Sequence, residues 1–322
     1  MNADPGHCRQ AVCDPEPQEG SAAGSGQWPL ISIVTPSYNQ GQFLEETITS
    51  ILAQGYPRLQ YVVIDGGSTD NSVATIRRYA DRIDFWVSER DRGQSCAINK
   101  GLARCTGDLF NWINSDDMLA PGALWEIARA WRGQPGRIVA GHTEWFNAAG
   151  PFELLKASGQ TLRNFVRFWE AEGWGWAQPS TFVPLAELKA IGGVREDLKY
   201  CFDYHMMVRL LARELEVVYI DRPLARFRFH EDSKTVGAKE EFRLERIDML
   251  RAERQSGITV APWEWDREQA RRFLDVGWHA LRAGRMRRGL RLCARAVRTS
   301  PRGAWLELSA RLRRRFRLSG RA

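Results

Sequence analysis

The chain has 322 residues, and its 43% hydrophobic and 11% aromatic content suffices for a core in one large domain or two ordinary ones. The net charge of +7 is unevenly distributed, because residues 282–322 hold fourteen Arg and one acid, Glu307; this tail carries +13 and the other 281 residues carry −6. The six cysteines show no CxxC pair and no metal-ligand spacing, which argues against a zinc or dithiol site and favours reduced cytosolic thiols.

Residues 1–27 are rich in Gly, Ala, Ser, Pro and Glu without periodicity, which predicts a disordered lead-in. Three short apolar segments then predict strands, at residues 30–34, 59–64 and 83–87. Segments with helical spacing or helix-capping residues predict helices between and after them, at residues 43–54, about 70–79 and 95–103. Strand, loop and helix in alternation predict an α/β fold, with a mostly parallel sheet flanked by helices.

Polar loops follow the predicted strands at the point where each strand ends. They are residues 35–41, 65–70 and 114–117, the last after the apolar run 107–113. Because ligands bind at the carboxyl ends of the strands in such sheets, these loops are predicted to meet at one crevice. Neither GxGxxG nor GxxxxGK[ST] occurs in the chain, which argues against a dinucleotide dehydrogenase and a P-loop NTPase.

Two adjacent carboxylates, Asp116 and Asp117, come directly after the predicted buried strand. Buried strands avoid paired acids, because an unpaired charge in an apolar interior is costly. A divalent cation takes hard oxygen ligands and bridges to phosphates, so the pair suits a metal site at a nucleotide. A solvated turn is the alternative, since Ser and Asp are ordinary turn residues.

Five sequence blocks in a fixed order resemble one known family. They are IVTPSYN at 33–39, VIDGGSTD at 63–70, DRGQS at 91–95, AINKG at 97–101 and NSDD at 114–117. They resemble the inverting glycosyltransferases of family 2, and further blocks extend the resemblance to about residue 235. The resemblance implies the Rossmann-like GT-A fold over a domain at 28–235. Its nucleotide-sugar half would be about 28–120 and its acceptor half about 121–235. The charge and periodicity of the tail predict a basic helical extension at 236–322.

On the donor side, the resemblance implies that the Asp65 carboxylate accepts a hydrogen bond from the pyrimidine base of a UDP-sugar. Pro36 and Tyr38 would line the base pocket. A turn Asp is the alternative for Asp65, because the residue opens a Gly-Gly-Ser turn. The other residues that the resemblance implies for nucleotide-sugar binding are Thr35, Asp91, Gln94, Asn99, Lys100 and Asp116.

The same resemblance implies that Asp117 binds Mg²⁺ or Mn²⁺ at the diphosphate, with His230 nearby as a second metal residue. Asp116 would approach the ribose or the sugar. One residue departs from the family pattern: Cys96 stands where Asp is common. A thiol does not accept hydrogen bonds as a carboxylate does, so a donor contact at Cys96 is not carried over.

The second half resembles the acceptor side of these enzymes. Asp203 corresponds to the general base, which takes the proton from the attacking acceptor hydroxyl. A helix cap is the alternative for Asp203. His205 departs from the pattern, since relatives often carry a second Asp there. Trp174, Trp176 and Gln178 are predicted to bind the acceptor, because flat aromatic faces suit sugar rings.

Taken together, the resemblance implies an inverting, metal-dependent hexosyltransferase that acts on a glycan or lipid-linked acceptor in cell-surface polysaccharide or glycan synthesis. A catalytically inactive GT-A-like module that binds sugar or nucleotide is the alternative, which Cys96 and His205 favour. The intact acids Asp65, Asp117 and Asp203, together with His230, oppose it.

The tail has apolar residues at helical spacing over 267–281, 290–297 and 304–318. The first two segments predict an antiparallel helical pair. Basic amphipathic helices often lie on anionic membranes, although a solvated helical face is the alternative. Nucleic acid is not expected as a partner, because no nucleic-acid-binding fold is found and aromatic residues are not interleaved with the basic ones in the way that such binding requires. The chain has no 18-residue apolar run and no secretory-type leader, which predicts a cytoplasmic protein, peripheral at the inner face of the membrane.

Overall fold

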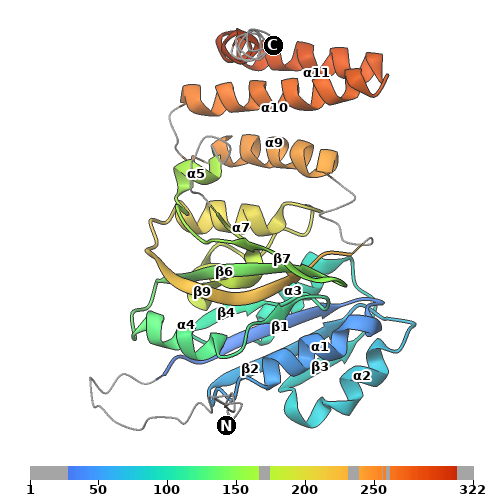
Figure 1. The fold of residues 1–322 in the computed structure, drawn as a ribbon. Coiled ribbons are helices and arrows are strands. Elements are labelled where there is room, and N and C mark those ends of the chain that lie inside the picture. Colours follow the sequence, from blue (N-terminus) through green and yellow to red (C-terminus); the bar gives the residue numbers. More distant parts are fainter. Residues whose placement is uncertain (1–27, 167–174, 231–238, 256, 259–261, 310–322) are drawn as a thin grey trace, which may run out of the picture.

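The computed structural model describes residues 28–166, 175–230, 239–255, 257–258 and 262–309, and Figure 1 shows how the elements are layered. The predicted lead-in at 1–27 lies outside the described residues. The strands are β1 (Ile31–Ser37), β2 (Leu59–Asp65), β3 (Phe85–Ser88), β4 (Leu109–Trp112), β5 (Met118–Leu119), β6 (Ile138–Asn147), β7 (Gly150–Leu155), β8 (Thr181–Pro184) and β9 (Val217–Arg228).

The helices of the first 211 residues are α1 (Gly41–Leu52), α2 (Ser72–Arg78), α3 (Gln94–Arg104), α4 (Ala123–Trp131), α5 (Leu162–Val166), α6 (Leu185–Ala190) and α7 (Phe202–Leu211). Two short 3₁₀ turns, η1 (Ala80–Arg82) and η2 (Gln178–Ser180), accompany them. Three further helices follow, α9 (Lys239–Gln255), α10 (Pro262–Arg282) and α11 (Met286–Thr299). The strands and helices predicted up to residue 112 are confirmed, with ends shifted by a few residues.

One sheet joins the described strands in the order β3-β2-β1-β4-β8-β6-β9-β5, and β7 pairs with β6. The half built from β3, β2, β1 and β4 is parallel, while β8 runs antiparallel to both β4 and β6. All seven residues of β1 are buried, as expected for a central parallel strand with helices on both faces. The predicted α/β architecture is therefore confirmed.

Two apolar cores cover the two faces of the sheet. One joins β1 and β2 to α1, α2 and α4, and the other joins β2 and β4 to α3, α6 and α7. Helix α3 crosses very close to β1, because a Cβ added to Gly101 would lie 2.5 Å from the Val34 side chain. This close packing fixes the loop between β3 and α3 against the end of the sheet.

The register of the parallel strands aligns their carboxyl ends. Ser37 at the end of β1 lies opposite Asp65 at the end of β2, and Asp65 lies opposite Ser88 at the end of β3. The backbone N–H of Gly66 donates to the Ser37 carbonyl at 2.8 Å, which ties two of the loops together. Val34 of β1 lies opposite Trp112, the last residue of the parallel strand β4. The three polar loops predicted to converge, which follow β1, β2 and β4, therefore leave the sheet along one edge.

Helices α7, α9, α10 and α11 form successive layers above the sheet (Figure 1). Helix α9 was not predicted; it binds α7 through Glu253, which pairs with His205 at 2.8 Å and Arg209 at 3.2 Å. The predicted pair, α10 and α11, is confirmed, and Gly277 and Gly289 let the two helices approach closely. Of the third predicted tail helix, residues 301–309 are helical and the remainder lies outside the described residues. Within the described chain, no helix combines the length and apolarity that a membrane crossing requires.

Candidate functional site

A cavity of about 1180 Å³ lies at the carboxyl edge of the parallel strands. One wall comes from the loops that follow β1, β2, β3 and β4. The opposite wall comes from β6, β9 and the start of α7, together with three side chains of α9. Segments more than 200 residues apart in sequence thus share one cavity.

Pro36, Tyr38 and Asp91, which were predicted to bind the nucleotide-sugar, line the wall formed by these loops. Tyr38 is 62% exposed and lines the cavity. Asp91 Oδ1 accepts a hydrogen bond from the backbone N–H of Gly93 at 2.8 Å. Its Oδ2 lies 2.9 Å from the position that a Cβ of Gly66 would occupy, so the absence of a side chain at Gly66 makes room for this carboxylate.

Asp65 has no exposed surface, and its carboxylate is committed to the loop that follows it. Oδ2 accepts hydrogen bonds from the N–H groups of Gly67 (3.1 Å) and Ser68 (2.9 Å) and from Ser88 Oγ (2.7 Å). Ser68 Oγ donates to Oδ1 at 2.5 Å. The predicted contact with a nucleotide base is therefore not available in this conformation, and the residue shapes the Gly66-Gly67 turn that does line the cavity.

The paired acids lie in different surroundings. Asp117 is buried, and its oxygens accept hydrogen bonds from the Arg228 N–H and the Asn114 side-chain amide, both at 3.1 Å. Burial and the adjacent Asp116 carboxylate raise the pKa of Asp117 well above its ordinary value. Asp116 lines the cavity instead, and its Oδ2 lies 3.0 Å from His230 Nε2. The sequence predicted that Asp117 holds the metal; in this structure Asp116 is the acid that faces the cavity.

Asp116 and His230 are hydrogen-bonded to each other, at a separation that two ligands of one metal ion would also have. Ligands of Mg²⁺ lie about 2.1 Å from the ion, so neighbouring ligands of an octahedron are about 3 Å apart. The 3.0 Å separation of Asp116 Oδ2 and His230 Nε2 agrees with this value. No group of three or more His, Cys, Asp or Glu side chains that could hold a metal occurs among the described residues. Such an ion would therefore take further ligands from diphosphate oxygens and water, as Mg²⁺ commonly does.

Asp203 lies in the first turn of α7, half-buried, with its carboxylate in the cavity wall. The backbone N–H of Tyr204 donates to Oδ1 at 2.6 Å. Burial raises the pKa of the Asp203 carboxyl to about 6, while the Tyr204 N–H and the positive charge of Arg246 act in the opposite direction. A carboxylate with this pKa is ionised at neutral pH and basic enough to accept a proton.

Helix α9 holds the start of α7 in place. The Glu245 carboxylate accepts hydrogen bonds from the N–H groups of Lys199, Tyr200 and Cys201, each at 2.7 Å. Phe242, Arg243 and Arg246 of the same helix line the cavity. Sequence reasoning missed these residues, although their spacing of three and four residues would put them on one face of a helix.

Of the three residues predicted to bind the acceptor, two line the cavity and one lies outside the described residues. Trp176 lines the cavity, and its ring packs against Phe165 (5.3 Å between centroids) and Tyr204 (6.0 Å). Its Nε1 is buried and has no hydrogen-bond partner among the described residues. Gln178 also lines the cavity but donates to Asn111 Oδ1 (2.7 Å) and the Trp112 carbonyl (2.8 Å). Trp174 lies outside the described residues.

An aromatic wall that was not predicted lies on the same side. Trp145 and Phe229 have ring centroids 5.0 Å apart, and Phe227 and Phe229 are 5.1 Å apart. All three line the cavity. Phe227 and Phe229 alternate with polar residues in the segment that ends at His230. Such alternation is typical of a strand with one apolar face, so the two aromatic residues could have been identified from the sequence.

Several residues predicted to bind the nucleotide-sugar donor have side chains that form hydrogen bonds or ion pairs with other parts of the fold. Thr35 Oγ1 bonds the Tyr61 hydroxyl at 3.0 Å, Asn99 bonds the backbone of Val194, and Lys100 pairs with Glu89 at 2.8 Å. Gln94 does line the cavity, where its amide donates to Asn114 Oδ1 at 2.7 Å.

The two departures from the family pattern are both buried. Cys96 lies within α3, and His205 pairs with Glu253 of α9. Neither is among the residues of the described chain that line the cavity.

A protein-family model described as "Glycosyl transferase family 2" matches residues 32–173. An uncharacterized glycosyltransferase of Rickettsia typhi is 26% identical over 221 residues, 64% of this chain and 66% of that protein. The O-antigen biosynthesis protein RfbC of Myxococcus xanthus is 29% identical over 61% of this chain and 16% of its own length. The putative teichuronic acid biosynthesis glycosyltransferase TuaG of Bacillus subtilis is 35% identical over 28% and 36%. The chain thus spans less than two thirds of these relatives.

Two solved structures have the same fold. Residues 1–349 of S. aureus TarS, in complex with UDP-GlcNAc, match with a TM-score of 0.56 at 15% identity, over 85% of this chain and 92% of that one. The mannosyltransferase PcManGT from Pyrobaculum calidifontis, in complex with GDP-Man and Mn²⁺, matches with a TM-score of 0.55 at 19% identity, over 88% and 80%. The predicted GT-A fold is confirmed.

Proposed function

Since residues 32–173 place this chain in glycosyltransferase family 2, we propose that it moves a sugar from a nucleotide-diphosphate sugar to an acceptor hydroxyl, with inversion and with a divalent metal. One observation carries the proposal: Asp91 and Asp116 on the donor side and Asp203 on the opposite side line one cavity. The bound UDP-GlcNAc and GDP-Man of the two structural neighbours support a nucleotide-sugar donor.

Each wall of the cavity has a distinct role in this proposal. Pro36, Tyr38 and Asp91 hold the nucleotide, with the Tyr38 ring against the base. Asp116 and His230 hold Mg²⁺ or Mn²⁺, which stabilises the negative charge of the departing diphosphate. Asp203 accepts the proton of the acceptor hydroxyl as the hydroxyl attacks the anomeric carbon, and a single base of this kind suffices for inversion.

The acceptor is proposed to be a glycan or lipid-linked saccharide of a cell-surface polymer. The names of the relatives from Myxococcus xanthus and Bacillus subtilis, which refer to O-antigen and teichuronic acid synthesis, support this class. The aromatic wall of Trp145, Phe227 and Phe229 suits sugar rings, whose C–H groups pack against aromatic faces.

A panel of nucleotide-sugars with Mn²⁺ tests the proposal through thermal stabilisation and slow hydrolysis of the donor. We expect one or a few UDP- or GDP-sugars to stabilise the protein and to be hydrolysed. Binding without hydrolysis by any donor, even with candidate acceptors present, would favour the inactive sugar-binding module instead. The absence of both binding and hydrolysis would contradict the proposal.

The basic tail is proposed to rest on an anionic membrane. Helix α11 carries Met286, Leu290 and Val297 on its outer side, 56%, 59% and 48% exposed, between exposed arginines. An apolar stripe flanked by cations matches the boundary between acyl chains and anionic head groups.

A further inference from the structure

We propose that Arg228 is a positioning residue of the metal site, because it fixes the turn that carries Asp116 and Asp117 relative to the segment that ends at His230. This inference rests on the proposed function, in which Asp116 and His230 hold the metal ion. Arg228 is the last residue of β9 and lies outside the cavity lining of the described chain. Its effect on an ion therefore acts through the side chains proposed to hold that ion.

Arg228 binds the turn of the two acids through both its backbone and its side chain. The backbone N–H donates to Asp117 Oδ1 at 3.1 Å, and Nε donates to the Asp116 carbonyl at 3.0 Å. These bonds tie two adjacent residues of the turn to a strand that follows 112 residues later. The side chain of Asp116, which lines the cavity, therefore leaves a turn whose position is set by Arg228.

The Arg228 guanidinium is itself held by three groups. One of its terminal nitrogens donates to Glu46 Oε2 of α1 at 2.8 Å. The guanidinium carbon lies 4.7 Å from the ring centre of Phe43 on α1 and 4.5 Å from that of Phe146 on β6. The side chain is 13% exposed, and cation–π contacts strengthen when the cation is withdrawn from water. Arg228 therefore connects α1 and β6 to the turn of the two acids.

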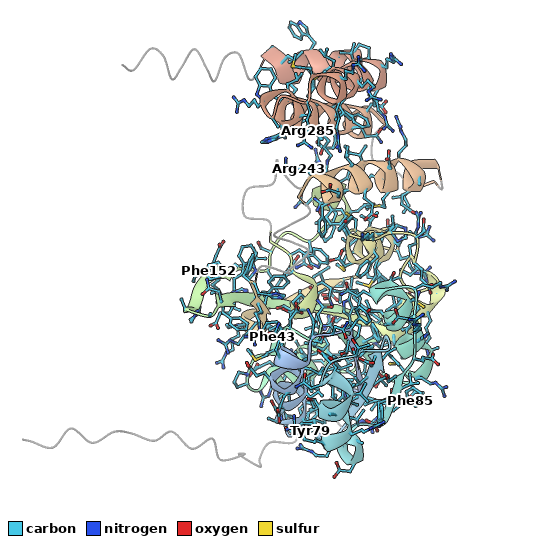
Figure 2. The ribbon with its side chains drawn as sticks, turned by 90° about the vertical axis from the view of Figure 1, so that its right-hand side faces the viewer. Phe43, Tyr79, Phe85, Phe152, Arg243 and Arg285 are labelled. Carbon is cyan, nitrogen blue, oxygen red and sulfur yellow. The ribbon has the colours of Figure 1, made fainter. Side chains whose placement is uncertain are left out.

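The same contacts extend to His230. Phe43 lies in the first turn of α1 (Figure 2), and its ring centre is 4.9 Å from that of His230. Because His230 follows Arg228 by two residues, the chain and the Phe43 ring both couple the positions of these two residues. Removing a group that orients metal ligands without touching the metal typically costs about 10- to 100-fold in metal affinity. Arg228 is placed to act in this way on both proposed ligands.

Arg226 shows which of these contacts are specific to Arg228. It lies two residues earlier and hence on the same face of β9. It forms an ion pair with Glu144 at 2.6 Å and lies 4.6 Å from the ring centre of Phe146. In the part of the chain that the structure describes, its side chain makes no hydrogen bond to the turn of the two acids. The two arginines thus have similar surroundings, and contact with this turn distinguishes them.

Calorimetry of UDP binding to the full chain, with and without saturating Mn²⁺, tests the inference. The ratio of the two affinities, here called the Mn²⁺ gain, isolates the contribution of the metal. We expect Arg228→Gln to reduce the Mn²⁺ gain by about tenfold or more, or to abolish a smaller gain, because the proposed ligands lose their fixed orientation. The affinity for UDP without metal should stay close to that of the unaltered protein. Electron paramagnetic resonance of free Mn²⁺ in the presence of UDP reads the same loss independently.

Arg226→Gln is the matched control, since it removes the same charge from the same strand, and we expect it to retain the Mn²⁺ gain. Glu46→Ala removes the outer partner of Arg228 and should lower the gain by a smaller factor. Because Glu46 is 57% exposed, this variant also covers the case that Arg228→Gln does not fold. Glu45→Ala is its control, because the neighbouring Glu45 pairs with Arg78 instead, at 2.9 Å. The melting temperature of each variant checks its folding.

Three results would overturn the inference: a full Mn²⁺ gain in folded Arg228→Gln or in Glu46→Ala, an equal loss of the gain in Arg226→Gln, or an equal loss of UDP affinity with and without Mn²⁺. The last would mean that the charge of Arg228 attracts the diphosphate directly. Failure of Mn²⁺ to raise the UDP affinity of the unaltered protein would contradict the proposed metal site, and this inference with it. The two failures are distinguishable, because the first three results are read in variants of a protein that does show the gain.

Discussion

Asp203 is expected to control the acid limb of the pH–rate profile. A general base works only when ionised, and burial raises the pKa of Asp203 to about 6, from an ordinary value of 3.8. Activity should therefore fall as the pH drops through about 6. Because the Arg246 charge lowers this pKa, Arg246→Gln should move the acid limb of kcat/KM to higher pH. Arg251→Gln is the control, and an unmoved limb in Arg246→Gln would argue against Asp203 as the titrating base.

Asp203→Asn tests the base more directly. The amide cannot accept the proton, so transfer should fall about 10²–10⁴-fold. Calorimetry with UDP and Mn²⁺ should give an affinity close to that of the unaltered protein, because Asp203 belongs to α7 and not to the loops proposed to hold the nucleotide. Near-normal turnover in the variant would exclude this role for Asp203.

The paired acids should respond differently to substitution. Asp116→Ala should remove the gain in UDP affinity that Mn²⁺ provides and leave thermal stability nearly unchanged. Asp117→Ala leaves the Arg228 N–H and the Asn114 amide without acceptors, and each unsatisfied buried donor costs about 1–3 kcal/mol. It should therefore lower the melting temperature clearly. Loss of the Mn²⁺ effect in Asp117→Ala at an unchanged melting temperature would restore Asp117 as the metal ligand.

Sequence reasoning identified the acids of the site more easily than their orientation. Asp91, Asp116 and Asp203 were predicted in the site, and all three line the cavity. Which member of a pair faces the cavity depends on contacts across the fold. Arg228, which binds the Asp117 carboxylate, is 111 residues away in sequence. No local pattern encodes such a contact.

At the scale of elements, the parallel half of the sheet was predictable because each strand is a short apolar run ended by a polar loop. The second half of the sheet was not predictable in this way. Strand β5 has two residues, and β9 pairs with β6, about 80 residues earlier, with irregular register. Helix α9 was missed because its sequence is highly charged, and its buried residues, such as Ile247 and Leu250, are few.

Helix α9 was assigned by sequence to a separate extension at 236–322, yet it lines the cavity and binds α7. We propose that it works as part of the catalytic domain. Glu245→Ala should lower the free energy of unfolding by about 2 kcal/mol, because three N–H groups lose a charged acceptor. It should also lower kcat by loosening the turn that carries Asp203. Glu241→Ala, an exposed acid on the same helix, is the control, and equal effects of both variants would contradict the proposal.

At the scale of the whole molecule, the charge distribution and the layering of the helices both favour the proposed membrane contact at the tail. The tail residues 282–322 carry +13 while the other residues carry −6. Helices α10 and α11 lie at the opposite end from α1 and α2, with α7 and α9 between them and the sheet (Figure 1). A membrane bound at α11 would therefore be nearer to the acceptor wall of the cavity than to the base of the sheet, which suits an acceptor attached to a lipid.

Replacing Met286, Leu290 and Val297 together with Ser should leave stability nearly unchanged, because all three side chains are about half exposed. It should reduce binding to phosphatidylcholine vesicles with 30% phosphatidylglycerol by roughly tenfold in co-sedimentation, through lost apolar insertion. Binding of the unaltered protein should weaken with salt and be absent on pure phosphatidylcholine, because arginines supply the attraction. Phe152→Ser, an exposed aromatic far from the tail (Figure 2), is the control. Unchanged vesicle binding in the triple variant would favour a solvated helical face instead.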